Sequence, residues 1–429
     1  MPANDIRTLT EDNEQLRRAV EELSVLNDLA RTIGGSLDGE QVIRAIVRRS
    51  LDAVGAEQGL VTLATQDESS SMRTLLRTRV SSTSVGASAY HFNQSLLGWM
   101  QLNMKPLVID DPATDERFKG VRWEENVRSI LCVPMTVRSR LIAVLTVFNK
   151  RGEGSFSNED KRLLSIIASQ SAQVVENTRL REQEQELERM RHEVRLAAII
   201  QGNLLPRKGP VVEGYDIAGK TSQAQMVGGD FFDFVERPDS AWAITLGDVS
   251  GKGLPASLLM SNVQAMLRTL ALGNASPEES LRIASRLLFK TTDVDKYVTI
   301  VHALLDPVRH QLVYTNAGHT QPFFVRSDGV VGRLRHRELM LGLTDEFPFT
   351  SREIDLDSGD MVVIFSDGIN ETVDAGGEEF GEDRITPLLR DYRGESSESI
   401  IERLIASVHS HSGGGAQQDD ITVVVVRRI

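Results

Sequence analysis

The sequence predicts an α+β protein with an N-terminal domain of strands and helices, a long connecting helix and a C-terminal antiparallel β-sandwich flanked by helices. Three observations support this prediction. Short apolar runs bounded by turn residues recur in both halves of the chain. Between the halves, apolar residues keep a seven-residue spacing until Pro206. In the C-terminal half the strands fall into two groups with helices between them, which favours a layered sandwich.

The N-terminal elements follow in order. The first is a helix over 5–34, where leucines recur every seven residues and two glycines end the pattern. A second helix is expected at about 41–54. Four apolar runs then predict strands, at 59–64, 74–80, 129–137 and 141–149. Between the second and third of these, the sequence predicts a short helical turn from Leu96 and another extended segment at 105–109.

A long helix is expected to begin near Ser157, with Asp160 in its first turn, where a negative charge favours the helix dipole. Two registers of apolar residues recur every seven positions: Leu180, Leu187, Val194 and Met190, Ala197, Leu204. Gln183 and Gln201 interrupt this pattern. The spacing, with Glu and Arg interleaved, is typical of the seam of a parallel dimer. A solvated linker helix packed on one domain is the alternative.

Strands dominate beyond position 210. Nine are expected, at 214–220, 230–236, 241–248, 298–305, 310–317, 321–326, 351–355, 360–366 and 421–427. Helices are expected at 253–272, 277–291, 382–390 and 397–409.

Composition limits the classes of function. A chain of 429 residues predicts two to four domains of roughly 100–200 residues each. A formal charge of −13 argues against nonspecific nucleic-acid binding. No apolar stretch approaches the roughly 20 residues that span a bilayer, and no signal peptide is visible. The single cysteine cannot form an intrachain disulfide. We therefore expect a cytoplasmic protein that has neither nucleic acid nor membrane as a partner.

Four aspartates lie in short turn motifs at or beside the ends of apolar strands. They are Asp230 in Val-Gly-Gly-Asp, Asp248 in Gly-Asp-Val-Ser-Gly-Lys-Gly, Asp367 in Phe-Ser-Asp-Gly and Asp419 in Asp-Asp-Ile-Thr. Four converging carboxylates repel one another unless protons or cations compensate. Oxygen ligands favour Mg²⁺ or Mn²⁺ over zinc, and paired divalent cations commonly serve phosphoryl hydrolysis. Each Asp-Gly alone is also an ordinary turn sequence.

The ordered set, from Val227–Asp233 through Asn316–His319 to Asp419–Thr422, resembles the metal-dependent protein phosphatases of the type 2C superfamily. More narrowly, it resembles their bacterial SpoIIE-like branch. The resemblance covers about 195–429. It implies a four-layer αββα sandwich, two divalent cations (Mn²⁺ or Mg²⁺), and in-line attack of water on phosphoserine or phosphothreonine without a covalent phosphoenzyme.

The resemblance also implies roles for particular residues. Asp230 would bind one cation, to which Val249 would offer its backbone carbonyl. Asp248 would bridge both cations, and Asp367 and Asp419 would hold the other.

Four further residues near these motifs are not expected to bind the cations directly. Asp233 and Asp420 are expected to orient bound waters from behind the ligands, although strand alternation leaves a surface role open for Asp233. Many eukaryotic members hold the substrate phosphate with an arginine near the first metal-binding aspartate, but no cationic residue directly precedes Asp230 here. Lys252 is therefore expected to hold the phosphate. The alternative is that Lys252 is an ordinary solvated loop lysine. His319 is interpreted as a hydrogen-bonded structural residue rather than a proton donor.

The N-terminal elements resemble a GAF domain over about 20–178. The motifs that carry this resemblance are Gly98-Trp99, Lys105-Pro106-Leu107, Cys132-Val133-Pro134 and Asn149-Lys150. GAF domains are sensors of small molecules or partner proteins with a central antiparallel sheet. The sequence does not identify the ligand.

Two motifs in this region are interpreted as structural. Asn149, Lys150, Phe156 and Asp160 fit part of the pattern of GAF domains that bind cyclic nucleotides, but Lys161 replaces the expected Glu. Cys132 has the Cys-x5-Arg spacing of tyrosine phosphatases. The intervening residues lack the glycines that let backbone amides wrap a phosphate, so we expect Cys132 in the core.

Together these observations predict four segments: an N-terminal helical segment (1–19), a GAF sensor domain (20–178), a linker helix or coiled coil (179–208) and a phosphatase domain (209–429). A homodimer is expected through the linker and the GAF helices. The resemblance implies a GAF-regulated phosphatase whose substrate is a phosphorylated anti-sigma-factor antagonist of the STAS class, in a bacterial stress or sporulation-type partner switch. The alternative is a catalytically inactive signalling scaffold that binds partners through a phosphatase-like domain.

Overall fold

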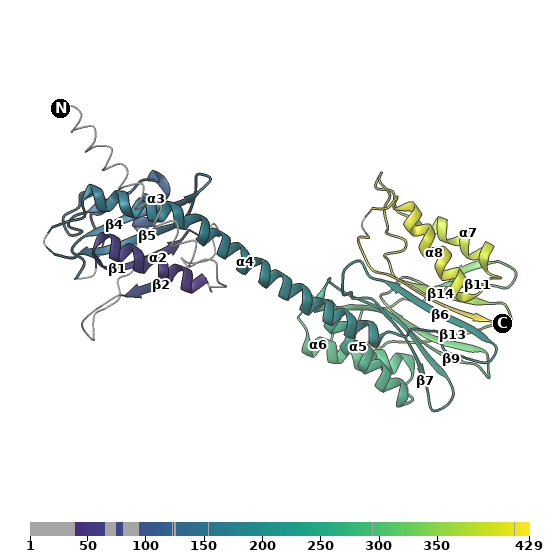
Figure 1. Cartoon of the computed structure of the whole chain (residues 1–429). Helices are drawn as coiled ribbons and strands as arrows, with labels where there is room; N and C mark the ends of the chain where they lie inside the picture. Colours follow the sequence, from purple (N-terminus) through teal and green to yellow (C-terminus); the bar gives the residue numbers. More distant parts are fainter. Residues whose placement is uncertain are drawn as a thin grey trace, which may run out of the picture. The chain divides into compact units, whose positions relative to one another are not determined.

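The structure is a computed structural model that describes residues 39–64, 74–79, 94–121, 123, 126–152, 154–293, 295–415 and 417–429. The helix predicted over 5–34 lies outside these residues. The chain divides into two compact units, Met1–Glu188 and Arg189–Ile429. Helix α4 (Asn158–Leu204) is continuous across this division (Figure 1). Among the described residues, no helix combines the length and apolar character needed to cross a membrane.

The first unit contains a five-stranded antiparallel sheet in the order β2-β1-β5-β4-β3. Its strands are β1 (Ala56–Leu63), β2 (Thr74–Arg79), β3 (Leu107–Ile109), β4 (Ile130–Val137) and β5 (Arg140–Lys150). Its other elements are α2 (Gly39–Val54), α3 (Gln94–Asn103) and the 3₁₀ helix η1 (Glu116–Phe118). The predicted strands are all present, α3 is longer than the predicted turn, and η1 was not predicted.

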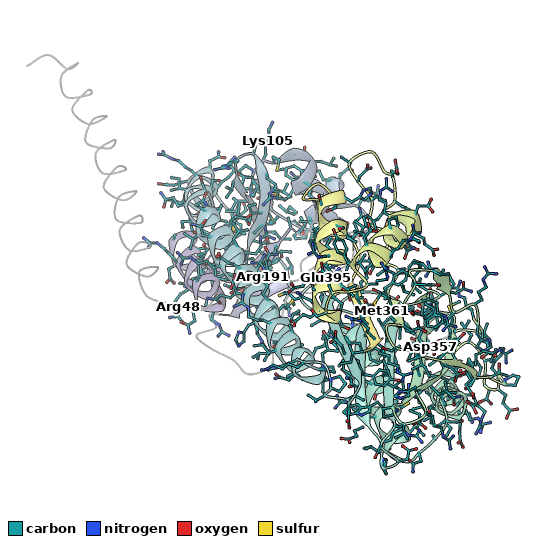
Figure 2. The ribbon with its side chains drawn as sticks, turned by 90° about the vertical axis from the view of Figure 1, so that its right-hand side faces the viewer. Arg48, Lys105, Arg191, Asp357, Met361 and Glu395 are labelled. Atoms are coloured by element: carbon teal, nitrogen blue, oxygen red, sulfur yellow. The ribbon has the colours of Figure 1, made fainter. Side chains whose placement is uncertain are left out.

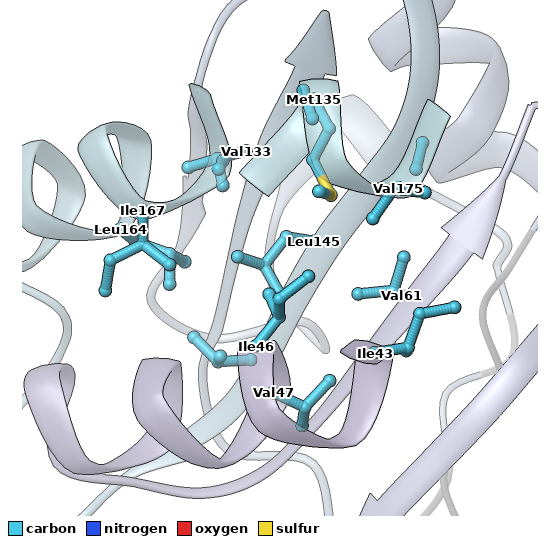
Figure 3. Packing of buried hydrophobic residues seen from close by; sticks show 14 of the residues in the cluster. Ile43, Ile46, Val47, Val61, Val133, Met135, Leu145, Leu164, Ile167 and Val175 are labelled. Atoms are coloured by element: carbon cyan, nitrogen blue, oxygen red, sulfur yellow. The ribbon is translucent and has the colours of Figure 1, made fainter. Parts of the chain in front are cut away.

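Successive side chains of a strand point to opposite faces of the sheet. Here each face packs against helices, so the strands contribute to two separate apolar clusters. On one face, Ile46 of α2, Leu145 of β5 and Leu164 of α4 pack in a single cluster (Figure 3). On the other face, Val144 of β5 packs with Met100 of α3. Each such side chain contributes about 1.5–3 kcal/mol when it leaves water.

The residues that partly match the cyclic-nucleotide pattern make contacts within the fold. Lys150 Nζ lies 2.7 Å from Asp160 Oδ1 and donates a hydrogen bond to the carbonyl of Val54 at 2.9 Å. Asp160 also accepts the backbone N–H of Ser157, just before α4. Asn149 has φ 55°, a left-handed conformation that asparagine tolerates. These contacts support the structural interpretation, since they join the sheet to α2 and α4.

Cys132 is fully buried, and its sulfur lies 3.4 Å from Thr146 Oγ1. Burial raises the pKa of the Cys132 thiol to about 12. The residue is therefore a neutral core thiol, as predicted, because a nucleophilic cysteine needs an accessible thiolate.

The second unit contains two five-stranded antiparallel sheets, in the orders β13-β10-β9-β8-β7 and β12-β11-β14-β15-β6. The strands are β6 (Tyr215–Ser222), β7 (Phe231–Glu236), β8 (Trp242–Val249), β9 (Val298–Asp306), β10 (Gln311–Ala317), β11 (Phe323–Val325), β12 (Val331–Arg333), β13 (Arg352–Asp355), β14 (Met361–Phe365) and β15 (Ile421–Arg428). Only β12 was not predicted from the sequence.

Helices cover the outer faces of both sheets. Helices α5 (Leu254–Leu272) and α6 (Pro277–Thr291) pack on the first sheet, and α7 (Gly381–Tyr392) and α8 (Ser397–His411) on the second (Figure 1). Met361, at the start of β14, is buried beneath α7 and α8 (Figure 2). A separate apolar cluster fills the space between the sheets. This four-layer αββα arrangement confirms the predicted fold class.

A row of polar side chains crosses the first sheet. Asp233, Thr245, His302 and Thr315 are cross-strand neighbours on β7, β8, β9 and β10, and all four are buried. Asp233 bonds to side chains of α5, so this row faces the helices and not the interior of the sandwich.

Replacing His302 by glutamine is expected to make the protein less sensitive to acid. His302 Nδ1 lies 2.8 Å from Thr245 Oγ1, and burial lowers the pKa of His302 from 6.5 to about 4. Between pH 6.5 and about pH 4, the histidine of the unfolded chain binds a proton that the folded chain does not, so the free energy of unfolding falls as the pH falls. His302→Gln cannot take up this proton. The loss of unfolding free energy between pH 7 and pH 4 should therefore shrink by about 3 kcal/mol.

Urea unfolding at both pH values measures this difference. His409→Gln, at an exposed position of α8, is the control and should follow the wild type. Parallel pH profiles for His302→Gln and wild type would contradict the prediction.

Candidate active site

Each sheet of the second unit supplies two of the four predicted aspartates from the ends of paired strands. Asp230 directly precedes β7, and Asp248 is the penultimate residue of β8, whose Gly247 pairs with Phe231. In the other sheet, Phe365 at the end of β14 pairs with Val423 of β15. Asp367 and Asp419 therefore flank this pair of strands at one end of the second sheet.

Three of the four carboxylates have raised pKa values, and the charge of the fourth, Asp419, contributes to two of these shifts. Burial, and then the charge of Asp248, raises the pKa of Asp230 well above its usual value. Burial raises the pKa of Asp248 to about 7, with further contributions from Asp367 and Asp419. The pKa of Asp367 is raised by burial and by Asp419. The structure thus brings all four predicted residues into one acidic group that spans both sheets.

The loop before β7 packs so closely against this group that a side chain would not fit. A Cβ atom added to Gly229 would lie 2.7 Å from the carbonyl oxygen of Val249, and one added to Gly228 would lie 2.0 Å from Asp420 Oδ2. The two glycines allow the backbone before Asp230 to approach both neighbours. The carbonyl of Val249, which is predicted to bind a cation, therefore lies beside the loop that carries Asp230.

Replacing Gly228 by alanine is expected to displace Asp420 and lower both activity and cation affinity. Asp420 accepts the N–H of Ala224 at 2.8 Å and that of Asp230 at 3.4 Å, so its movement would release the loop that carries Asp230. Loss of such supporting contacts typically costs about 10–100-fold in metal affinity or activity. Titration with Mn²⁺ and a turnover assay measure the effect.

Gly202→Ala is the matched control. Nothing lies within 4 Å of a Cβ atom at Gly202, which is on the exposed side of α4. Alanine there should leave activity unchanged and stabilise the helix by about 0.5–1 kcal/mol. Equal activity of Gly228→Ala and Gly202→Ala would show that Asp420 need not be held in place.

The acidic group fits divalent cations, although it is not a preformed cage. Among the described residues, no three acidic, histidine or cysteine side chains form a ready-made metal cluster. However, Asp230 Oδ2 is buried and has no hydrogen-bond partner in the described part of the chain. Carboxylates with raised pKa values, an unpartnered buried oxygen and a nearby carbonyl form an all-oxygen set, which suits Mg²⁺ or Mn²⁺.

Lys252 contacts this group directly. Its ammonium lies 3.0 Å from Asp419 Oδ2 and donates a hydrogen bond to the carbonyl of Gln418 at 2.7 Å. Both side chains of the ion pair are about half exposed, 50% for Lys252 and 53% for Asp419. The lysine thus offsets part of the acidic charge in this structure. The pair is weak, because exposed ion pairs contribute about 0–1 kcal/mol.

Asp233 does not join the other aspartates. Its carboxylate forms an ion pair with Arg268 of α5 and accepts a hydrogen bond from Gln264 at 3.2 Å. Strand alternation turns it away from the Asp230 side, as expected, but the carboxylate is buried beneath α5 and not at the surface. Asp420, by contrast, does lie beside Asp230, where it holds the backbone of the preceding loop.

His319 links the ends of the two sheets. Its Nε2 donates to the carbonyl of Phe365 at 3.1 Å, so its Nδ1 accepts from Thr299 Oγ1 at 2.8 Å. Burial lowers the pKa of His319 to about 4. Asn316 holds both the N–H and the carbonyl of His319. These contacts agree with the structural role inferred from the sequence.

Two residues near the site had no predicted role. Glu371 follows Asp367 by one turn, and burial together with the charge of Asp367 raises the pKa of Glu371. Gln201, on α4, forms hydrogen bonds to the backbone of Gly228. The only sequence signal for Gln201 was its interruption of the apolar heptads.

The helix-flanked αββα sandwich, with acidic residues gathered at the strand ends of both sheets, is the architecture that the resemblance to type 2C phosphatases implies. Comparison with family models agrees: residues 238–429 match the model of stage II sporulation protein E (SpoIIE), and residues 36–176 match a GAF-domain model. The chain therefore combines an N-terminal GAF domain with a SpoIIE-type, PP2C-type phosphatase domain. Strands β6 and β7 precede the matched range but pair with β15 and β8 of the same sandwich.

Similar proteins include two curated relatives. Phosphoserine phosphatase RsbU of Bacillus subtilis is 28% identical over 267 residues, which cover 62% of this chain and 78% of RsbU. Protein IcfG of Synechocystis sp. is 26% identical over 257 residues, which cover 53% of this chain and 40% of IcfG. Among solved structures, the SiaA-PP2C domain of Pseudomonas aeruginosa is 23% identical with a TM-score of 0.49, over 56% of this chain and 98% of that domain.

Proposed function

We propose that the protein is a GAF-regulated, Mn²⁺- or Mg²⁺-dependent phosphatase that acts on phosphoserine or phosphothreonine in a partner protein. The observation that carries this proposal is the acidic group of Asp230, Asp248, Asp367 and Asp419, in which burial and neighbouring carboxylates raise the pKa values of Asp230, Asp248 and Asp367. The similarity to a phosphoserine phosphatase supports it.

In this proposal Asp230, Asp248 and the Val249 carbonyl would hold one cation, and Asp367 and Asp419, together with Asp248, would hold the other. Bound divalent cations supply positive charge that favours hydroxide over water and offsets charge on a phosphoryl oxygen. Asp420 contributes by holding the loop of Asp230 in place.

A cationic side chain, Lys252, and a neutral one, His319, complete the proposed mechanism. Lys252, half exposed beside Asp419, donates to a nonbridging oxygen of the substrate phosphate, since its ammonium can swing from one anionic oxygen to another. His319 stays neutral and fixes the Phe365 carbonyl, which holds the turn that carries Asp367.

The substrate, by family resemblance, is a phosphorylated anti-sigma-factor antagonist of the STAS class in a cytoplasmic stress or sporulation-type partner switch. We also propose the segment boundaries 1–19, 20–178, 179–208 and 209–429.

A homodimer through α4 is part of the same proposal. Leu180, Leu187 and Met190 are 50%, 49% and 51% exposed along one helix, an arrangement that supports a seam with a second copy. Leu187→Asp should convert a dimer into a monomer in sedimentation experiments, whereas an unchanged mass would contradict the seam.

Regulation is proposed to pass from the GAF domain to α5. A GAF ligand, whose identity is open, would change the twist or register of α4 and bias the position of the helix that follows Asp248. This coupling requires that the ligand bind the two states with different affinity. Deleting residues 1–178 should alter turnover or metal affinity; no change in either would argue against control by this domain.

The central test is phosphate release from a phosphoserine protein with Mn²⁺ or with excess chelator. The proposal expects release only with the cation, and loss of release in Asp367→Asn. Equal release in chelator would overturn the mechanism. Binding of the phosphoprotein without turnover, with Mn²⁺ present, would favour the scaffold alternative.

A further inference from the structure

Gln201 lies in the last turn of α4, on the side that contacts the loop before Asp230. It is 3% exposed although glutamine is usually found at the surface. Its side chain forms two bonds to one residue: Nε2 donates to the carbonyl of Gly228 at 2.7 Å, and Oε1 accepts the N–H of Gly228 at 3.2 Å. Gln223 Nε2 donates to the same Oε1 at 3.1 Å.

We propose that Gln201 is a positioning residue for the cation-binding site, acting through Gly228 on Asp230. This inference rests on the proposed function. A primary amide that pairs with both the N–H and the C=O of one residue fixes that peptide as a neighbouring strand would. Because Gly228 is two residues before Asp230, the amide of Gln201 contributes to the position of the Asp230 carboxylate.

The other side of the loop is held independently. Asp420 accepts the N–H groups of Ala224 and Asp230, while Gln201 binds the residue between them in sequence, Gly228. The loop is thus held between an amide on α4 and a carboxylate at the start of β15. Only a neutral side chain that both donates and accepts can serve on the α4 side, because Gly228 offers one group of each kind.

The helix that carries Gln201 is itself anchored. The carbonyl of Leu204, one turn further on, accepts a hydrogen bond from Gln264 at 2.9 Å and a longer one from Arg268 at 3.4 Å. Both donors belong to α5, which begins shortly after Asp248. The last turn of α4 therefore contacts both the loop before Asp230 and the helix that follows Asp248. All of these residues belong to the second unit.

Two variants of the full-length protein test this role. Gln201→Leu removes both bonds to Gly228 while keeping the volume similar. Gln201→Glu keeps the acceptor for the Gly228 N–H but loses the donor to its carbonyl. Gln185→Leu, at an exposed position of the same helix that lies outside the seven-residue apolar pattern, is the matched control. None of these residues contacts substrate or cation in the proposed mechanism.

The first readout needs no activity. In the metal-free protein, hydrogen exchange of the peptide that covers residues 224–231 should accelerate by about 10-fold or more in Gln201→Leu, and less in Gln201→Glu. Exchange in β14 and β15 should stay unchanged, which shows that the fold is intact. Unchanged exchange at 224–231 would overturn the inference directly.

The second readout is Mn²⁺ affinity. Gln201→Leu should weaken it by about 10–100-fold, and turnover should recover largely at saturating Mn²⁺, because the residue orients a ligand and is not one itself. A purely structural role would lower the melting temperature of the variant but leave Mn²⁺ affinity as in Gln185→Leu, and this result would overturn the inference. If the wild type neither binds Mn²⁺ nor releases phosphate, the proposed function fails, whereas the exchange result still decides whether Gln201 holds the loop.

Discussion

Replacing Asp248 by asparagine is expected to lower phosphate release by at least about 100-fold, the upper end of the loss seen when residues around a metal are removed. The same change should stabilise the protein in chelator. Burial and two neighbouring carboxylates raise the pKa of Asp248 to about 7, so above that pH its charge is held at a cost. Asparagine removes this charge, and the unfolding free energy at pH 8 should rise by about 2 kcal/mol or more.

Turnover with saturating Mn²⁺ and urea unfolding in chelator measure the two effects. The gain in stability should disappear near pH 4, where Asp248 is protonated in the wild type as well. Asp391→Asn, at an exposed position of α7, is the control for a lost carboxylate. An Asp248→Asn variant that is both active and less stable in chelator would contradict the role assigned to this residue.

Replacing Arg268 by methionine is expected to destabilise the second unit by about 2–4 kcal/mol, because it leaves the Asp233 carboxylate buried without its cationic partner. The Asp233 side chain is 4% exposed and that of Arg268 is 45% exposed. Water can reach the arginine but not the carboxylate, so the cost falls on Asp233. The variant also loses the contact to the Leu204 carbonyl.

The double variant Asp233→Leu, Arg268→Met separates charge from packing. It should recover most of the lost stability, since apolar groups can replace a buried ion pair at little cost. Arg390→Met, at an exposed position of α7, is the control. If thermal unfolding of Arg268→Met matches that of Arg390→Met, the buried pair contributes nothing measurable to the fold.

Much of the fold follows from local sequence patterns. Strand β15 reads Ile-Thr-Val-Val-Val-Val and is buried through Val426, so its apolar run predicted it almost to the residue. Strand β12 was missed because its three residues, Val331–Arg333, are only partly buried and carry no periodic pattern. Such short edge strands are defined by the neighbour they pair with, here β11, and not by their own composition.

The aspartates of the site could be predicted because each one marks the end of a strand, and strand ends are visible in the sequence. Their partners could not. The Arg268 that pairs with Asp233 is 35 residues away, and Gln201 is 27 residues from Gly228. Nothing local distinguishes these side chains from other polar residues of an exposed helix. Lys252 shows the same limit, since its contact with Asp419 depends on how the two sheets are stacked.

The neutrality of His319 has a consequence for the pH–rate profile. One imidazole nitrogen donates a hydrogen bond to the Phe365 carbonyl and the other accepts one from Thr299. The ring takes up a proton only near pH 4. Turnover between pH 5 and 9 should therefore show no inflection from this ring. A limb near pH 6 would belong instead to the acidic side chains or to the phosphomonoester itself, whose second ionisation lies at about pH 6.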